Sequence, residues 1–228
     1  MIILLPMSRF RAIYRSMRRR SGFRIQSKKG RCHRGYYWVY YSPLSRAVLF
    51  DYQATRGRDG PARMLDDFKG YLQTDGYEVY EQYQDQTGIQ HLGCWAHARR
   101  YFEKALDNDY ERAGHAMKQI QDLYEVERRA RQEKLSPSDR KELRLEDSLA
   151  VLDELGEWIS EIGPNVLPQS PIGKAMSYTA RRWENLKGCL YDGHLEIDNN
   201  LVENQIRPLA AKRTGCLPVL IMQPVEQG

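Results

Sequence analysis

Acidic residues are missing from the first fifty positions of this 228-residue chain, although the whole sequence contains 30 of them. Cysteine is scarce, and the four cysteines are too widely spaced to form a Cys-x-x-Cys pair. This spacing argues against a zinc ribbon and provides no disulfide framework. Long apolar runs are also lacking, since residues 1–6 are too few to span a bilayer or to form the core of a signal peptide. We therefore expect a cytoplasmic protein with no membrane partner.

The charges that are present nearly balance. Charged residues make up 29% of the chain, hydrophobic residues make up 41%, and the formal net charge is +5. This composition is typical of a globular chain with a sizeable core, and the small basic excess favours a polyanionic partner only modestly. Residues 1–27 differ, because they contain seven arginines and no acid. This segment is either a basic arm that grips phosphates or a segment that belongs to no evolved fold.

The region after residue 35 alternates strand and helix patterns. We predict strands, helices and a hairpin at these positions: strands over 36–41 and 46–52 joined as a hairpin, a helix from Pro61 to about 70, a strand from Leu72 to Asp75, a short helix over 78–84, a strand over 89–92 and a helix over 95–106. This order is typical of an α/β fold, in which ligands lie beyond the carboxyl ends of strands. Asp75 would lie at such an end, although spacing alone also fits a simple Asp-Gly turn.

Residues 107–188 are helical in pattern. Apolar residues recur every three or four positions from Ala113 to Val126 and from Leu149 to Ile162, and a third such stripe follows Pro171. The charged stretch from Arg128 to Arg144 is interpreted as a solvated face, with contact to DNA as the less favoured alternative. Cys94-x-x-His97 has a metal-like spacing but lacks a second pair of ligands, so a buried thiol beside a helix is preferred to a zinc site.

The stretch from Asp198 onward begins another helix. Asn199 and Asn200 are good N-cap residues, and Pro208 should end or kink the helix. Glu203 has two interpretations. It is either the third residue of a capping box with Asn200, or a metal-binding carboxylate near the start of a helix.

Four separated motifs, in this order, resemble the insertion-sequence-66 family of bacterial transposases. They are HRGYYWVY at residues 33–40, GYLQTDGY at 70–77, GCWAHARR at 93–100 and DNNLVENQIRPL at 198–209. The resemblance covers roughly residues 28–210.

This resemblance implies a ribonuclease-H-like mixed sheet, of about four or five strands, with a helical insertion between the second and third acidic residues of an Asp-Asp-Glu triad. Asp75 matches the second acid and Glu203 the third, so both are implied as catalytic residues and as ligands of Mg²⁺ or Mn²⁺. The implied reaction is metal-dependent cleavage and transfer of DNA strands. Its partners are the ends of the element and the target DNA, and a homo-oligomer stays open. Arg99, Arg100 and Arg207 lie beside the acidic motifs and are expected to contact DNA phosphates.

The resemblance also suggests how the chain is divided. The expected segments are 1–27, a basic non-family segment that is disordered or frameshifted; 28–106, the first part of the catalytic core; 107–190, the helical insertion; 191–210, the core helix with the third acid; and 211–228, a frameshifted non-family tail.

The chain departs from the family at the first acid of the triad. The family places it just before the position taken by Arg24, and this sequence has none there. A change of reading frame is one explanation, because two CGA arginine codons read one base later give Asp followed by Asp or Glu. We therefore predict an inactive fragment of a transposase. The alternatives are a non-enzymatic DNA-binding remnant and a nuclease of the same fold.

Overall fold

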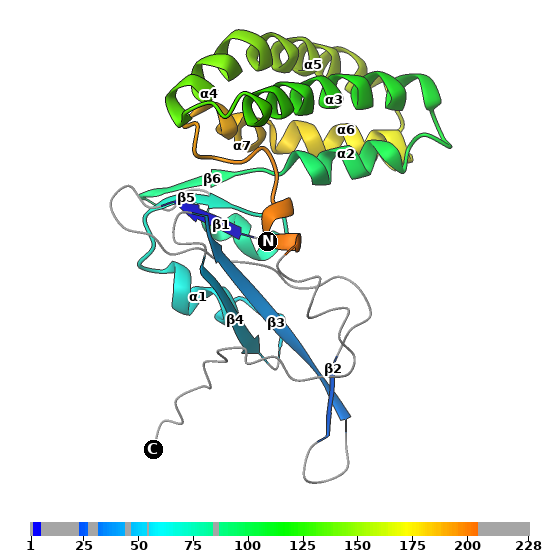
Figure 1. The fold of residues 1–228 in the computed structure, drawn as a ribbon. Coiled ribbons are helices and arrows are strands. Elements are labelled where there is room, and N and C mark those ends of the chain that lie inside the picture. Colours follow the sequence, from blue (N-terminus) through cyan, green and yellow to red (C-terminus); the bar gives the residue numbers. More distant parts are fainter. Residues whose placement is uncertain are drawn as a thin grey trace. The chain divides into compact units, whose positions relative to one another are not determined.

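The computed structural model describes residues 2–5, 23–26, 32–43, 47–53, 55–83 and 87–204, and of residues 2–5, 23–26, 32–35, 37 and 63 it describes only the backbone. The chain divides into two compact units (Figure 1). The sheet unit takes the described residues up to His91 and those from Asn199 onward. The helical unit is Leu92–Asp198.

A mixed six-stranded sheet forms the sheet unit. Its strands are β1 (Ile2–Leu5), β2 (Phe23–Gln26), β3 (Cys32–Ser42), β4 (Ala47–Gln53), β5 (Gly70–Gln73) and β6 (Ile89–Leu92). The order is β2-β3-β1-β5-β6, with β4 also paired to β3. Strand β1 runs parallel to β3 and antiparallel to β5. The chain is thus mixed α/β, as predicted, with six strands where four or five were expected. Strands β1 and β2 lie within residues 1–27, the segment interpreted either as a basic arm or as part of no evolved fold.

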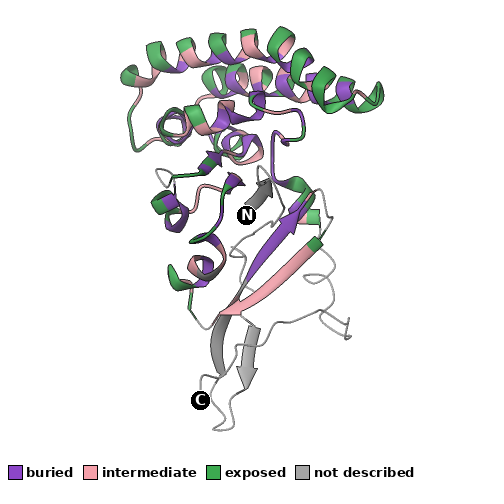
Figure 2. Ribbon diagram, turned by 90° about the vertical axis from the view of Figure 1, so that its left-hand side faces the viewer, coloured by how far each residue is buried: buried purple, intermediate pink, exposed green. Residues whose placement is uncertain are grey.

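The predicted hairpin is confirmed. Strands β3 and β4 pair antiparallel from Tyr36 opposite Gln53 to Ser42 opposite Ala47. The second half of β3 is buried, whereas β4 is mostly half-buried (Figure 2). Aromatic and β-branched side chains favour such a pleated, half-buried surface, which explains why their density in the sequence predicted these two strands.

One hydrophobic core holds the sheet unit together. It joins β3, the helix α1 (Asp59–Leu65), β5 and the 3₁₀ turn η1 (Glu78–Tyr83) to the last described helical turn, residues 200–204. Its fully buried members include Trp38, Tyr40, Leu65, Leu72 and Val202. Segments far apart in the sequence therefore share one core.

The helical unit contains the remaining elements. They are α2 (Trp95–Glu103), α3 (Tyr110–Gln132), α4 (Pro137–Leu143), the π-helical turn η2 (Arg144–Ser148), α5 (Leu149–Ile162), η3 (Gly163–Asn165), α6 (Pro171–Arg181), α7 (Trp183–Lys187) and η4 (Gly188–Leu190). The serine hydroxyls of Ser136 and Ser170 cap α4 and α6 by accepting backbone N–H groups. None of the helices in the described part of the chain combines the length and apolar character of a membrane span.

Candidate active site

Asp75 lies in a tight turn directly after β5. Its Oδ1 accepts a hydrogen bond from the backbone N–H of Tyr77 at 3.2 Å. Gly76 between them has a φ of +74°, a conformation that side chains with a Cβ rarely adopt. The two interpretations of Asp75, a residue of an Asp-Gly turn and a site residue at a strand end, are therefore compatible. The turn itself holds the half-buried Asp75 at the carboxyl end of a strand.

A buried pair beneath the turn anchors it to the sheet. Thr74 Oγ1 lies 2.7 Å from His91 Nε2 and also accepts the backbone N–H of Gly76 at 3.2 Å. Both side chains are buried. The residue before Asp75 is thus tied to β6 and the residue after it is tied to Thr74, which fixes the backbone on both sides of the carboxylate.

An arginine lies on the other side of the same turn. The Arg56 guanidinium carbon is 4.0 Å from the centre of the Tyr77 ring, and the Tyr77 hydroxyl donates to the Arg56 carbonyl at 3.4 Å. Tyr77 in turn packs edge-on against Tyr80, with ring centres 6.2 Å apart. The contact of Arg56 with the Tyr77 ring thus supports the turn at the residue that binds the Asp75 carboxylate.

Glu203 is carried by the helix that starts at Asn200. The Asn199 carbonyl accepts the N–H groups of Val202 at 3.1 Å and Glu203 at 3.3 Å, so Asn199 is the residue that precedes the helix. This places Glu203 at the fourth helical position and puts the capping box of Asn200 with Glu203 out of register. Val202 is fully buried in the same core as Leu72, while Glu203 is half-buried. The elements that carry Asp75 and Glu203 therefore pack on one core.

The segment that leads into this helix is held firmly inside the helical unit. The Tyr124 hydroxyl donates to Asp198 Oδ2 at 2.7 Å. Burial and the neighbouring Asp198 carboxylate raise the pKa of Tyr124 well above its usual value, so the phenol stays protonated and keeps donating. Asp198, the first residue of the fourth motif, is thus a buried hydrogen-bond acceptor and is anchored to α3.

Two arginines, the buried Arg144 and the half-buried Arg140, fix the preceding loop. Arg144 is 0% exposed, and its five N–H groups all donate, two to the Glu127 carboxylate and three to the carbonyls of Cys189, Asp192 and Leu195. Its neighbour Arg140 also contacts Glu127. The interpretation of residues 128–144 as a solvated face is therefore wrong for both arginines. They satisfy the carboxylate and carbonyl groups that burial would otherwise leave unpaired.

Arg140 extends this network to the next turn of the loop. It donates to both oxygens of Glu196, at 3.1 and 3.0 Å, and to the Gly193 carbonyl at 3.2 Å. Gly193 packs so tightly against Pro137 that an added Cβ would lie 1.7 Å from the Pro137 carbonyl oxygen. We call Glu127, Arg140, Arg144 and Glu196 the arginine clamp. It holds residues 189–196 in one conformation.

The clamp makes stability dependent on pH. Burial of Glu127 by itself raises the pKa of its carboxyl, but the bonds from Arg144 and Arg140 outweigh it, and the pKa is lower than the usual 4.5. A depressed pKa contributes stability that is present above 4.5 and is lost as the pH falls through the folded-state value. We expect the urea concentration at the unfolding midpoint to decrease as the pH is lowered beneath 4.5. The Glu127→Gln variant should show a weaker dependence of this midpoint on pH. An equally steep curve for Glu127→Gln would contradict this assignment.

The arginines predicted to contact DNA differ in their exposure to solvent. Arg100 is exposed on α2, whereas Arg99 is half-buried and close enough to Tyr124 to lower the pKa of that phenol in part. Both lie in the helical unit, while Arg207 lies outside the described residues. Nearby, the buried Cys94 thiol is 3.1 Å from His97 Nδ1 at the start of α2, which fits the buried thiol preferred from the sequence.

The described residues do not fit the two-metal site implied by the resemblance. Among them, no group of three His, Cys, Asp or Glu side chains is arranged to hold a metal ion. Asp51, the first acid in the chain, lies on β4, where its Oδ2 accepts hydrogen bonds from Gln53 at 2.8 Å and Tyr40 at 3.3 Å. Asp59 is exposed in the first turn of α1. Neither of these two carboxylates belongs to a group of three potential metal ligands among the described residues.

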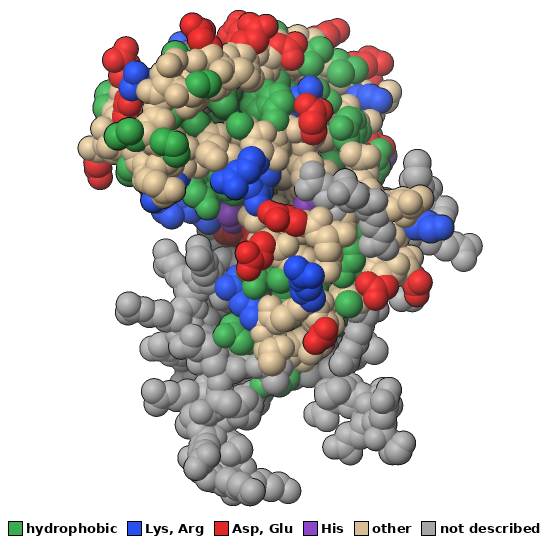
Figure 3. All heavy atoms as spheres, turned by 180° about the vertical axis from the view of Figure 1, so that it is seen from behind, with side chains coloured by type: hydrophobic (Ala, Val, Ile, Leu, Met, Phe, Trp, Pro, Cys, Tyr) green, Lys and Arg blue, Asp and Glu red, His purple; other side chains and the backbone are tan. Residues whose placement is uncertain are grey.

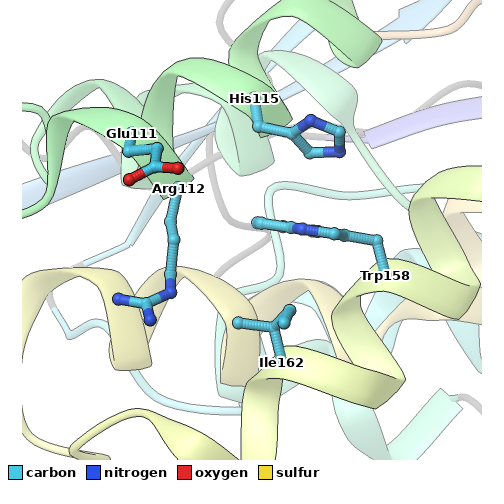
Figure 4. A pocket seen from close by; sticks show the side chains of 5 residues that line it. All are labelled: Glu111, Arg112, His115, Trp158 and Ile162. Carbon is cyan, nitrogen blue, oxygen red and sulfur yellow. The ribbon is translucent and has the colours of Figure 1, made fainter.

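A recess of about 340 Å³ lies between α3 and α5 in the helical unit (Figure 4). His115 lies against Trp158 there, with ring centres 4.6 Å apart, beside Glu111, Arg112 and Ile162. Arg112 is already bound to Asp109 at 2.6 Å. The recess contains none of the four motifs and is not part of the candidate site.

Several supporting residues were not predicted from the sequence. His91 had a local signal, because it alternates with Ile89 on one side of a strand. Arg56, Tyr124, Arg140 and Arg144 had none, since their partners lie far away in the sequence.

Comparison with known proteins supports the motif assignment. The chain matches the family model described as Transposase IS66 family over residues 21–219. It is 35% identical over 179 residues to the uncharacterized protein y4qI of Sinorhizobium fredii, covering 75% of this chain and 33% of that protein. It is 29% identical over 182 residues to the uncharacterized protein y4jD of the same organism, covering 77% and 35%. No solved structure matches the chain.

The chain spans about a third of the length of these relatives. Within that third, the family model includes both the Asp75 turn and the helix with Glu203, which the structure packs on one core. The chain belongs to the IS66 family of transposases.

Proposed function

We propose that this chain is part of the catalytic domain of an insertion-sequence transposase, which still binds DNA but no longer cuts it. The proposal depends on two observations. The helix that carries Glu203, the match to the family's third acid, packs on the same core as the strand before Asp75. The first fifty residues of the chain contain no acidic residue. Its fold would be ribonuclease-H-like. Support comes from the mixed sheet, with the helical unit inserted between Asp75 and Glu203.

The chemistry explains why the missing acid matters. Strand cleavage and transfer at phosphorus use two divalent ions about 4 Å apart, one at the attacking oxygen and one at the leaving oxygen. Such ions need several converging oxygen ligands. Asp75 and Glu203 supply two carboxylates, which would hold at most one Mg²⁺ or Mn²⁺ ion weakly. The shared ligand between the ions is the one that this sequence lacks.

DNA binding does not need that ligand. We expect weak, sequence-independent binding to duplex DNA, with log Kd rising linearly with log salt at about 0.9 per phosphate contacted. Arg100→Gln should weaken binding a few-fold and lower this slope by about one, because Arg100 is exposed on α2. Arg99→Gln should do less, since Arg99 is half-buried near Tyr124.

Fluorescence anisotropy with labelled duplexes over a salt series measures both quantities. The matched control is Glu103→Gln, an exposed neighbour on the same helix, which should leave binding unchanged or slightly tighter. Undetectable binding at low salt, or binding indifferent to salt, would contradict the proposal.

A further inference from the structure

The helical unit has a polarised surface. Helix α2 with Lys104 and helix α6 with Arg182 together carry six cations and a single carboxylate, Glu103, a net charge of +5. The cations are Arg99, Arg100, Lys104, Lys174, Arg181 and Arg182. Helix α5 is the opposite, with four exposed carboxylates and no Lys or Arg. Acidic side chains gather along the α5 side of the unit, and the larger group of Lys and Arg lies away from it (Figure 3).

Aromatic rings order the basic side. Tyr101 on α2 stacks on Tyr178 of α6, with ring centres 4.3 Å apart and planes 20° apart. The Arg182 guanidinium carbon lies 4.6 Å from the centre of the Tyr178 ring, and Lys104 Nζ lies 5.8 Å from the centre of the Tyr101 ring. Each ring of the stacked pair thus has a cation close to it.

This arrangement is suited to phosphates. A guanidinium lying on an aromatic ring loses less side-chain freedom on binding and can present a planar donor edge to phosphate oxygens. Tyr178 is buried, so the stack is supported by the unit's core, while Tyr101 is 36% exposed and Lys104 is exposed. A diffuse basic surface would have no need of such a buried support.

We infer that the α2–α6 face, defined by Tyr101, Lys104, Tyr178 and Arg182, binds the phosphodiester backbone of duplex DNA. The inference rests on the proposed DNA binding and assigns it to a surface of the helical unit. Charge complementarity selects the partner, because the two helices that form the face carry six cations and one carboxylate, whereas α5 would repel a polyanion.

Anisotropy titrations with a labelled duplex of unrelated sequence test the inference. The double variant Lys104→Gln with Arg182→Gln should bind about tenfold more weakly at low salt, with a salt slope lower by about two. The matched control is Lys118→Gln with Arg131→Gln on α3, which makes the same charge change at two exposed positions and should alter affinity less than about twofold.

A charge-neutral variant separates an ordered site from a diffuse field. Tyr101→Leu removes the ring stack and should cost about threefold in affinity, whereas Tyr101→Phe should bind as the unchanged chain does. Circular dichroism confirms that each variant is folded.

Equal losses in the α2–α6 and α3 double variants would overturn the inference and leave the proposed DNA binding standing. Binding by the unchanged chain that no α2–α6 variant alters would do the same. No binding by the unchanged chain at low salt would overturn both.

Discussion

The purified chain is expected to show no Mg²⁺- or Mn²⁺-dependent cleavage of DNA that carries the ends of its own insertion sequence. Positioning and charge neutralisation supply most of the catalysis of phosphoryl transfer, so loss of a shared metal ligand should reduce the rate by several orders of magnitude. The first acidic residue of this chain is Asp51 on β4, whose carboxylate accepts hydrogen bonds from Gln53 on the same strand and from Tyr40 on β3. It is a poor replacement for the missing acid.

The measurement is a gel assay of end-labelled DNA with each metal in turn. Restoring the family reading frame at both termini should recover cleavage, and Asp75→Asn in that restored chain should abolish it again. Asp51→Asn is the matched control, because it changes a neighbouring acid of the same unit and should leave the recovered activity largely intact.

Two results would count against this prediction. Cleavage by the unchanged chain that Asp75→Asn abolishes would show that another residue supplies the third ligand. Cleavage of any DNA, without preference for the element ends, would favour the alternative of a nuclease of the same fold. Either result would end the claim of an inactive enzyme.

Local patterns in the sequence predicted most elements of the fold. The 89–92 strand and the apolar stripe from 149 to 162 coincide with β6 and α5. Ser136, which stands directly before Pro137, caps α4. These features depend on neighbouring residues only, through alternation, helical spacing or a serine hydroxyl that reaches the backbone three positions later.

Long-range features were not predictable in the same way. Four apolar residues at β1 carry too short a pattern to show that they insert between β3 and β5. The Asp75 turn was readable from Asp-Gly, but its buried partner His91 lies on another strand. Charged side chains in a helical pattern are exposed by default, so nothing local distinguished Arg144 from the exposed Arg129.

The arginine clamp should be the largest single contributor to the stability of the helical unit. Arg144→Met is expected to lower the free energy of unfolding by about 3–5 kcal/mol, because it leaves a buried carboxylate short of partners. It also orphans the carbonyls of Cys189, Asp192 and Leu195. Glu127→Gln should cost less, since a Gln side chain still offers an oxygen to the arginines.

Urea unfolding followed by tryptophan fluorescence measures the effect, because Trp95, Trp158 and Trp183 all lie in the helical unit. Arg129→Met is the matched control. It breaks the exposed pair of Arg129 with Asp147, next to the clamp in the sequence, and should cost less than about 1 kcal/mol.

Arg144→Lys tests whether geometry or charge matters. A lysine keeps the positive charge but has three donors on one nitrogen, whereas Arg144 places five N–H groups on a carboxylate and three carbonyls. We therefore expect Arg144→Lys to remain nearly as unstable as Arg144→Met. If Lys restored the full stability, or if Arg144→Met cost no more than Arg129→Met, the clamp would be an ordinary ion pair, and the loop before the Glu203 helix would have to be held by other contacts.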